Sequence, residues 1–274
     1  MKPAPTLLVV TPTLGDSSYL DATVASVRAL PFAVIHLLAV PAPRVAELQQ
    51  RYPHARVVAD AGRAGAIYGA LNAALDQAPA GWDWFTYIND DDLLLPGFAA
   101  AARRHFAAGA RAAPVAYGDV ELIDGAGRRV GVSTVTPDPR WIPALLQAGI
   151  SPLMQQGMLF RRDCVTRLHH FDLRYRLCAD LDFWLRACAA GEGFRYYHTP
   201  VAQFRLRGGQ LSGNTALTER EQQEIVRRLF PAPVPAWRRQ LAVWRYRLYN
   251  LPRYLTRIRT RGLVTSYTVL QEAG

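Results

Sequence analysis

The sequence predicts an α/β protein with a mainly parallel central sheet flanked by helices, followed by a helical, basic C-terminal extension. Short β-rich apolar runs alternate with stretches whose apolar residues recur at helical spacing. Parallel neighbouring strands need a crossover between them, so this alternation favours a parallel sheet. Three consecutive acids follow one of the apolar runs directly. Sheets of this class bind ligands beyond the carboxyl ends of their strands.

The elements of the first half follow from this periodicity in chain order. Apolar residues recur at helical spacing at Leu20, Val24, Val27 and Leu30, and again in the alanine-rich stretch Gly65–Leu75. The expected strands are Thr6–Val10, Ala33–Val40, Ala55–Ala59 and Trp84–Ile88, and the expected helices are Leu20–Leu30, Val45–Tyr52 and Gly65–Leu75.

The second half has a more mixed pattern and no internal repeat. A Gly-rich hairpin signal occupies Asp124–Gly127, and three prolines within Pro231–Pro235 indicate a linker that cannot continue a helix. The remaining expected elements are helices at Phe98–Ala107 and Leu181–Ala190, strands at Pro114–Tyr117 and Phe194–Tyr197, and a short apolar run at Met158–Phe160.

Composition excludes several classes of protein. Half of the 274 residues are hydrophobic, so the chain can bury a full core and is not intrinsically disordered. Three cysteines are too few for a disulfide framework, which fits a reducing compartment. No apolar run approaches the roughly 20 residues that span a bilayer, and no signal peptide is recognisable. We expect a cytoplasmic protein, peripheral at most on the inner face of the cell membrane.

The net charge of +10 is confined to the C-terminal tail. No acid lies between Ile225 and Gln271, whereas ten arginines do, and the rest of the chain holds 22 basic and 22 acidic residues. Aromatic and apolar residues are interleaved with these arginines, a pattern that suits an anionic membrane surface. The alternative is a helical pair packed on the domain with a solvated basic face. We expect Pro252 to divide the tail into two short helices. No nucleic-acid partner is expected, because no recognised nucleic-acid motif accompanies the charge.

The strongest local signal is Asn89-Asp90-Asp91-Asp92, directly after Trp84–Ile88. Adjacent carboxylates repel one another, and hard oxygen donors of this kind bind Mn²⁺ or Mg²⁺. The alternative is a solvated acidic turn in which one Asp caps the following helix.

With Pro96 four residues on, this run resembles the Asp-x-Asp region of family 2 glycosyltransferases, inverting enzymes of the GT-A fold that use nucleotide-sugar donors. The resemblance implies a divalent cation, Mn²⁺ or Mg²⁺, on Asp91 with support from Asp92. It also implies that Asn89 and Asp90 lie near the donor ribose or sugar.

Further donor contacts follow from the same resemblance. Thr11-Pro12-Thr13 is similar to the family's nucleotide loop, and Asp60, Arg63 and Asn72 match a segment that holds the nucleotide-sugar. The alternatives are a plain strand terminus, a solvated loop arginine and a satisfied helix-face amide. The acidic loop that family members carry after the second strand is missing, since Pro41-Ala42-Pro43 stands there. A UDP-sugar is the favoured donor, with the base left open.

The acceptor half resembles the family in three places. Gln156 precedes an aromatic-Arg-Arg run, and Asp180 and Asp182 lie in a segment similar to the catalytic acid motif. The resemblance implies that Gln156 and Asp182 contact the acceptor or the diphosphate, and the alternative for Gln156 is an ordinary loop amide. The resemblance implies that Asp180 is the general base; the alternative is a helix N-cap, with Asp182 in the first turn. Arg207 stands where the family commonly has His. Arginine cannot ligate a metal but can pair with phosphate, so Arg207 and Arg205 would contact the leaving diphosphate.

These expectations together predict the domain organisation and the activity of the chain. Residues 1–230 form a GT-A domain, with the nucleotide-sugar half at about 1–115 and the acceptor half at about 116–230, and 231–274 form the extension. The implied activity is metal-dependent, inverting transfer of a sugar to a saccharide or lipid-linked saccharide in polysaccharide or glycan biosynthesis. The alternative is a catalytically inactive, membrane-associated binding protein of the same fold. A dinucleotide-dependent oxidoreductase is disfavoured because Thr11–Gly15 replaces the Gly-x-Gly-x-x-Gly turn.

Overall fold

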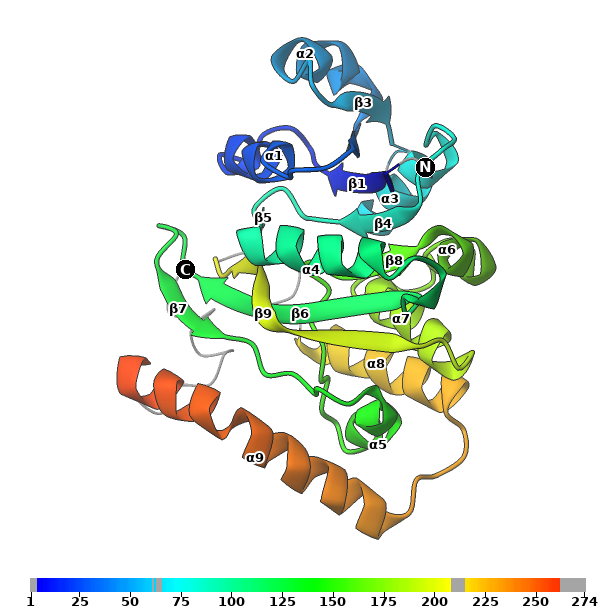
Figure 1. Ribbon diagram of the computed structural model, residues 1–274, viewed down its shortest axis with the longest axis vertical. Helices are drawn as coiled ribbons and strands as arrows, with labels where there is room; N and C mark the ends of the chain where they lie inside the picture. The colour runs from blue at the N-terminus through cyan, green and yellow to red at the C-terminus, as the bar shows by residue number, and fades with distance from the viewer. Residues whose placement is uncertain (1–3, 61, 63–65, 208–214, 262–274) are drawn as a thin grey trace.

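A computed structural model of the chain describes residues 4–60, 62, 66–207 and 215–261. These residues form one mixed sheet with helices against both of its faces (Figure 1). The strand order is β3-β2-β1-β4-β8-β6-β9-β5, with β7 paired to β6. The α/β class predicted from the sequence is confirmed.

The first half is the regular part of the sheet. All neighbours among its first four strands are parallel, and the register places Val10 of β1 beside Leu37 of β2 and Tyr87 of β4. The strands and helices lie where periodicity predicted them. They are β1 (Leu7–Pro12), α1 (Leu20–Arg28), β2 (Val34–Val40), η1 (Ala42–Arg44), α2 (Val45–Arg51), β3 (Arg56–Ala59), α3 (Ala66–Asp76) and β4 (Trp84–Tyr87).

The second half departs from a parallel pattern because β8 is antiparallel to both of its neighbours, β4 and β6. The strands β6 and β9 pair in parallel and extend well beyond their predicted ends. The elements are β5 (Leu93–Leu94), α4 (Pro96–Ala107), η2 (Gly109–Arg111), β6 (Val115–Ile123), β7 (Arg129–Val132), η3 (Pro139–Trp141), α5 (Ile142–Gln147), β8 (Leu159–Arg161), α6 (Arg162–Leu168), α7 (Ala179–Ala189), β9 (Phe194–Arg205) and α8 (Thr215–Leu229).

Alternating residues of the strands feed two separate apolar clusters. Leu8 and Val10 of β1 belong to a cluster that includes α3 and α7, whereas Leu7 and Val9 belong to one that includes α4. Successive side chains of a strand point to opposite faces, so both faces of the sheet are covered. The site is therefore confined to the edge where the strands end.

The helix α9 (Ala236–Arg261) is continuous, and the expected break at Pro252 is wrong. Proline removes one backbone hydrogen bond, but contacts on either side hold this helix in place. Asn250 bonds to the backbone of Val135, and Arg253 pairs with Asp119 of β6. Among the described helices, none is long and apolar enough to cross a membrane.

Candidate active site

The acidic run lies at the carboxyl edge of the sheet, beside the loop that follows β1. The hydroxyl of Thr13 donates a hydrogen bond of 2.6 Å to the Asp90 carboxylate, and Ser17 donates to the Asp90 carbonyl at 3.1 Å. The two loops meet because β1 and β4 are parallel neighbours. The alternative that an acid caps the next helix is wrong, since the N-cap of α4 is Leu95.

Asp92 is the buried anchor of this run. Its carboxylate accepts hydrogen bonds from the Arg205 backbone at 2.9 Å, from Gln156 at 3.1 Å and from Asn89 at 3.3 Å. Burial and the neighbouring Asp91 carboxylate raise the pKa of Asp92 well above its usual range. With both oxygens bonded inside the protein, Asp92 is placed to hold the turn together, and its expected support of a metal ion stays a prediction. Gln156 is bonded only through its Nε2, since its buried Oε1 has no hydrogen-bond partner among the described residues.

Asp91 differs from its neighbours because it meets a cation. The guanidinium of Arg207, two residues beyond the end of β9, donates from Nε to Asp91 at 2.7 Å, and the Arg207 side chain is 41% exposed. Arg205 instead bonds to the Asp91 carbonyl and lies over the Tyr19 ring. The predicted diphosphate contact therefore fits Arg207 better than Arg205, which links two loops.

The residues fit a divalent cation only as part of a shared site. No group of three His, Cys, Asp or Glu side chains within the described part of the chain could hold a metal ion. A Mg²⁺- or Mn²⁺-type site, however, commonly uses one or two carboxylates together with substrate phosphates. Asp91 supplies one carboxylate of this kind, and a bound diphosphate and water would supply the remaining ligands.

Asp180 occupies a different environment at the start of α7. The Tyr68 hydroxyl donates to its Oδ1 at 3.0 Å, the Leu181 backbone donates at 2.7 Å, and Tyr87 of β4 also bonds to it. Burial raises the pKa of Asp180, and it raises the pKa of both tyrosines well above 10, so both remain neutral donors. Asp180 is the second residue of α7, and the N-cap is Cys178, so the capping alternative is wrong.

The loop before Asp180 is held from α8 by Glu221. This buried carboxylate accepts hydrogen bonds of 2.9 Å from three successive backbone N–H groups, those of Arg176, Leu177 and Cys178. Sequence reasoning missed Glu221, Tyr68 and Tyr87. No local signal marks Glu221, because its partners lie more than forty residues earlier in the chain.

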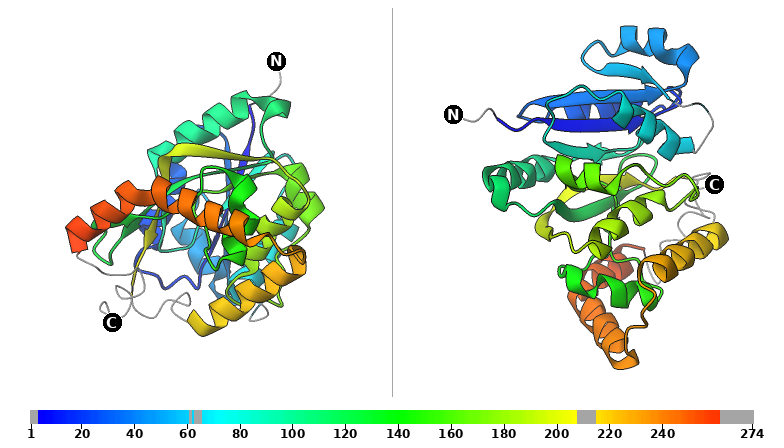
Figure 2. Two further views of the ribbon diagram at one scale, coloured as in Figure 1. Left: turned by 90° about the horizontal axis from the view of Figure 1, so that it is seen from below. Right: turned by 90° about the vertical axis from the view of Figure 1, so that its right-hand side faces the viewer.

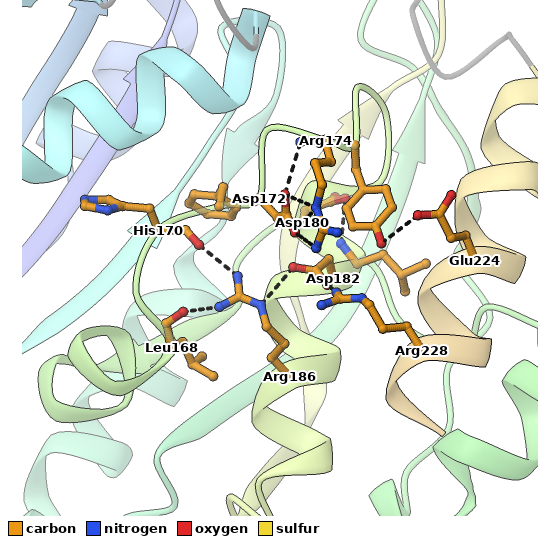
Figure 3. A network of polar contacts seen from close by, with 12 residues as sticks. Leu168, His170, Asp172, Arg174, Asp180, Asp182, Arg186, Glu224 and Arg228 are labelled. Carbon is orange, nitrogen blue, oxygen red and sulfur yellow. Dashed lines mark hydrogen bonds and ion pairs between the residues drawn. The ribbon is translucent and has the colours of Figure 1, made fainter. Parts of the chain in front are cut away.

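Asp182, two residues beyond Asp180, is the centre of an ion-pair cluster (Figure 3). It is fully buried and pairs with Arg186 of the same helix at 2.8 Å and with Arg228 of α8. Arg186 also reaches the carbonyls of Leu168 and His170. These contacts give Asp182 a structural role in joining α7 to α8, and the acceptor or diphosphate contact expected of it stays a prediction.

The other predicted donor residues divide into two groups. Thr11 is buried and bonds to His36, and both amide atoms of Asn72 bond to the Phe171 backbone, so these two support the fold. Pro12 ends β1 at the site edge, and Asp60 accepts from the Gly62 backbone beyond β3. Arg63 lies outside the described residues.

An arginine stands at the position of the missing acidic loop. After β2, Arg44 donates to the carbonyls of Leu14 and Gly15 and pairs with Glu47 at 2.7 Å. The loop after β1 is thus tied to η1 by a cation, and any base selectivity must come from groups other than the expected acid.

No protein-family model and no curated protein match the chain. Among solved structures, S. aureus TarS is 13% identical with a TM-score of 0.57, over 94% of this chain and 44% of that chain. The chain has a GT-A-like fold. Residues 1–349 of TarS in complex with UDP give the same identity and TM-score over 95% and 76% of the two chains.

A second neighbour extends the comparison of the GT-A-like fold. The mannosyltransferase PcManGT from Pyrobaculum calidifontis, in complex with GDP-Man and Mn²⁺, is 12% identical with a TM-score of 0.56. The similarity covers 99% of this chain and 79% of that chain. At such identities the likeness establishes the fold alone, and this chain spans less than half of the longer TarS chain.

Proposed function

We propose that the protein is an inverting glycosyltransferase that moves a sugar from a nucleotide-diphosphate donor to a saccharide hydroxyl. One observation carries this proposal: two carboxylates at one sheet edge have opposite surroundings. Asp91 meets the Arg207 guanidinium, whereas Asp180 is held by two tyrosine hydroxyls. Tyr87, which bonds to Asp180, is the last residue of β4, and the acidic turn begins two residues later at Asn89, so both environments lie at the end of this strand.

In this mechanism Asp180 removes the proton from the acceptor hydroxyl as the acceptor oxygen attacks the anomeric carbon. The bond from that carbon to the diphosphate breaks in line, so one displacement inverts the configuration. A raised pKa makes Asp180 a stronger base once it is ionised. Tyr68 and Tyr87 orient the carboxylate, and Glu221 fixes the loop that leads to it.

Charge on the departing diphosphate is balanced at the acidic turn. Arg207 provides a planar donor suited to phosphate oxygens. A divalent cation, Mn²⁺ or Mg²⁺, when bound beside Asp91, would add Lewis-acid stabilisation of the same charge. Thr13 and Asp90 keep the loop after β1 against this turn, where the ribose would lie.

The donor and acceptor are proposed by class. Complexes of the structural neighbours with UDP and with GDP-Man support a nucleotide-sugar donor, and we favour a UDP-sugar. We propose a saccharide or lipid-linked saccharide acceptor in cell-surface polysaccharide or glycan synthesis, on the cytoplasmic side.

Calorimetric titration with UDP and GDP, each with and without Mn²⁺, tests the donor site. We expect metal-enhanced binding of one diphosphate and a loss of about tenfold or more in Asp91→Ala, the scale of one charge-assisted contact. The matched control is Asp76→Asn, an exposed acid of α3 that pairs only with His170 among the described residues. Absence of binding to either diphosphate by the wild-type protein would refute the proposal, while binding without turnover on any donor would favour the inactive binding protein.

A further inference from the structure

The helix α9 carries most of the exposed apolar surface of the described chain. Among the described residues, nine large hydrophobic side chains are exposed, and only Leu14 and Leu173 of these lie outside α9. The seven on α9, between 42% and 67% exposed, are Trp237, Leu241, Trp244, Leu248, Leu251, Leu255 and Ile258. We call these seven side chains the α9 stripe.

The α9 stripe is one continuous line. Its members are alternately four and three residues apart, which places them on a single face of a helix. Because α9 runs without a break through Pro252, the stripe extends over about 32 Å at 1.5 Å per residue. Exposed apolar patches of this extent mark an interaction surface.

The opposite face of α9 is already occupied by the domain. Ala242 and Tyr246 pack with α5, and Asn250 is fully buried against Val135. The ion pair between Arg253 and Asp119, 2.6 Å long, fixes the distal part of the helix. The α9 stripe is therefore held facing away from the domain on a rigid support.

Cations border the stripe on both sides. Exposed arginines Arg238, Arg245 and Arg259 lie along one flank and Arg247 along the other, and no acid occurs anywhere in α9. If a second copy of the helix covered the stripe, these arginines would face one another across the seam and repel. A partner that presents negative charge beside an apolar layer is complementary to both the flanks and the stripe.

We propose that the α9 stripe is a docking surface for an anionic lipid bilayer, with the helix lying in the plane of the interface. Tryptophan and leucine side chains enter the headgroup and acyl boundary, and the arginines remain at the level of the lipid phosphates. Figures 1 and 2 place α9 at the end of the molecule opposite β3 and α2. On the proposed function, this brings the acceptor half nearest to lipid-linked acceptors.

The test is flotation of the full chain with vesicles of phosphatidylglycerol and phosphatidylcholine, compared with vesicles of phosphatidylcholine alone. We expect binding to the anionic vesicles at least tenfold stronger, and weakened by salt. The double variant Trp244→Ser, Leu248→Ser should lose at least 90% of the bound fraction. The control is Leu14→Ser, Leu173→Ser, which removes the two exposed leucines outside α9 and should bind as the wild type does.

A second double variant, Arg247→Gln, Arg259→Gln, tests the contribution of charge separately from that of the apolar stripe. It should weaken binding to the anionic vesicles about tenfold. Thermal melts confirm that each variant is folded, and no donor or acceptor is needed, so the outcome is independent of glycosyl transfer. Equal binding to neutral and anionic vesicles, or no binding by the folded wild-type protein, would overturn the proposal. So would a wild-type dimer in solution that Trp244→Ser, Leu248→Ser converts to a monomer, because the stripe would then be a self-association seam.

Discussion

The two carboxylate regions of the site differ in how their charge is compensated. At the acidic turn, Asp91 faces the Arg207 guanidinium and Asp92 is buried among hydrogen-bond donors. At the start of α7, the donors on Asp180 are tyrosine hydroxyls and a backbone N–H, all neutral. A carboxylate neutralised by a cation is a poor proton acceptor, whereas one held by neutral donors in a desolvated setting keeps its basicity. The turn is thus suited to anchoring charge and Asp180 to moving a proton.

The largest effect is expected at Asp180. Replacement of Asp180 by Asn keeps the shape and removes the base, so turnover should fall by about 10³-fold, within the range of general-base contributions. Nucleotide affinity should stay within about twofold, because the donor contacts lie at the other region. Steady-state kinetics and calorimetry on the same preparation measure both quantities. If Asp180→Asn kept its turnover, another residue would be the base, and the two carboxylate regions would not differ in function.

Asp182 sharpens the comparison because it lies only two residues from Asp180 yet is neutralised by Arg186 and Arg228. Asp182→Asn should lower the free energy of unfolding by about 2–3 kcal/mol, below the 3–5 kcal/mol of a fully buried pair, since both arginines are partly exposed. Urea unfolding measures this change. The exposed acid Asp163, which pairs with Arg161 and Arg167, is the control, and Asp163→Asn should cost under about 1 kcal/mol. Equal costs at the two sites would refute the structural role of Asp182.

Arg207 tests the other region. Arg207→Ala should weaken binding of the nucleoside diphosphate about tenfold, the loss of one charge-assisted hydrogen bond, and Arg207→Lys should restore part of it. Arg140→Ala, an exposed arginine that pairs with Asp138, serves as the control. If Arg207→Ala left the affinity for the nucleoside diphosphate unchanged, Arg207 at the acidic turn would not contact the diphosphate.

The sequence predicted the fold of the first half well because its signals are local. Periodicity located β1 to β4 and their helices, and the acids after Trp84–Ile88 located the site edge. The second half was harder, because the antiparallel insertion of β8 and the length of β9 depend on pairing between distant segments. At Pro252, tertiary contacts of Asn250 and Arg253 outweighed a local helix-breaking preference.

The acidic residues of the candidate site could be predicted from the sequence, but the role of each acid could not. Asp91, Asp92 and Asp182 look alike in the sequence, and only burial and distant partners distinguish a charged site residue from a structural one. Asn72 illustrates the same limit, since its amide is used entirely by the Phe171 backbone. Glu221, Tyr68 and Tyr87 carry no motif, because their importance comes from contacts with a segment far away in the chain.

The smallest and most specific effect concerns the pKa of Asp180. Its hydrogen bond from the Tyr68 hydroxyl favours the ionised carboxylate and so lowers the pKa against the larger effect of burial. Tyr68→Phe removes that bond while keeping the ring that stacks on Phe171. The pKa of Asp180 should therefore rise further.

Because the ionised form is the base, the acid limb of the kcat/KM profile should move to higher pH in Tyr68→Phe. The matched control is Tyr117→Phe, whose buried hydroxyl donates to the Thr136 carbonyl at 2.7 Å and not to Asp180. That variant should lose comparable stability, about 1 kcal/mol, and leave the acid limb in place. If the acid limb moved equally in both variants, the cause would be a general loss of stability. The neutral donors around Asp180 would then not determine its basicity.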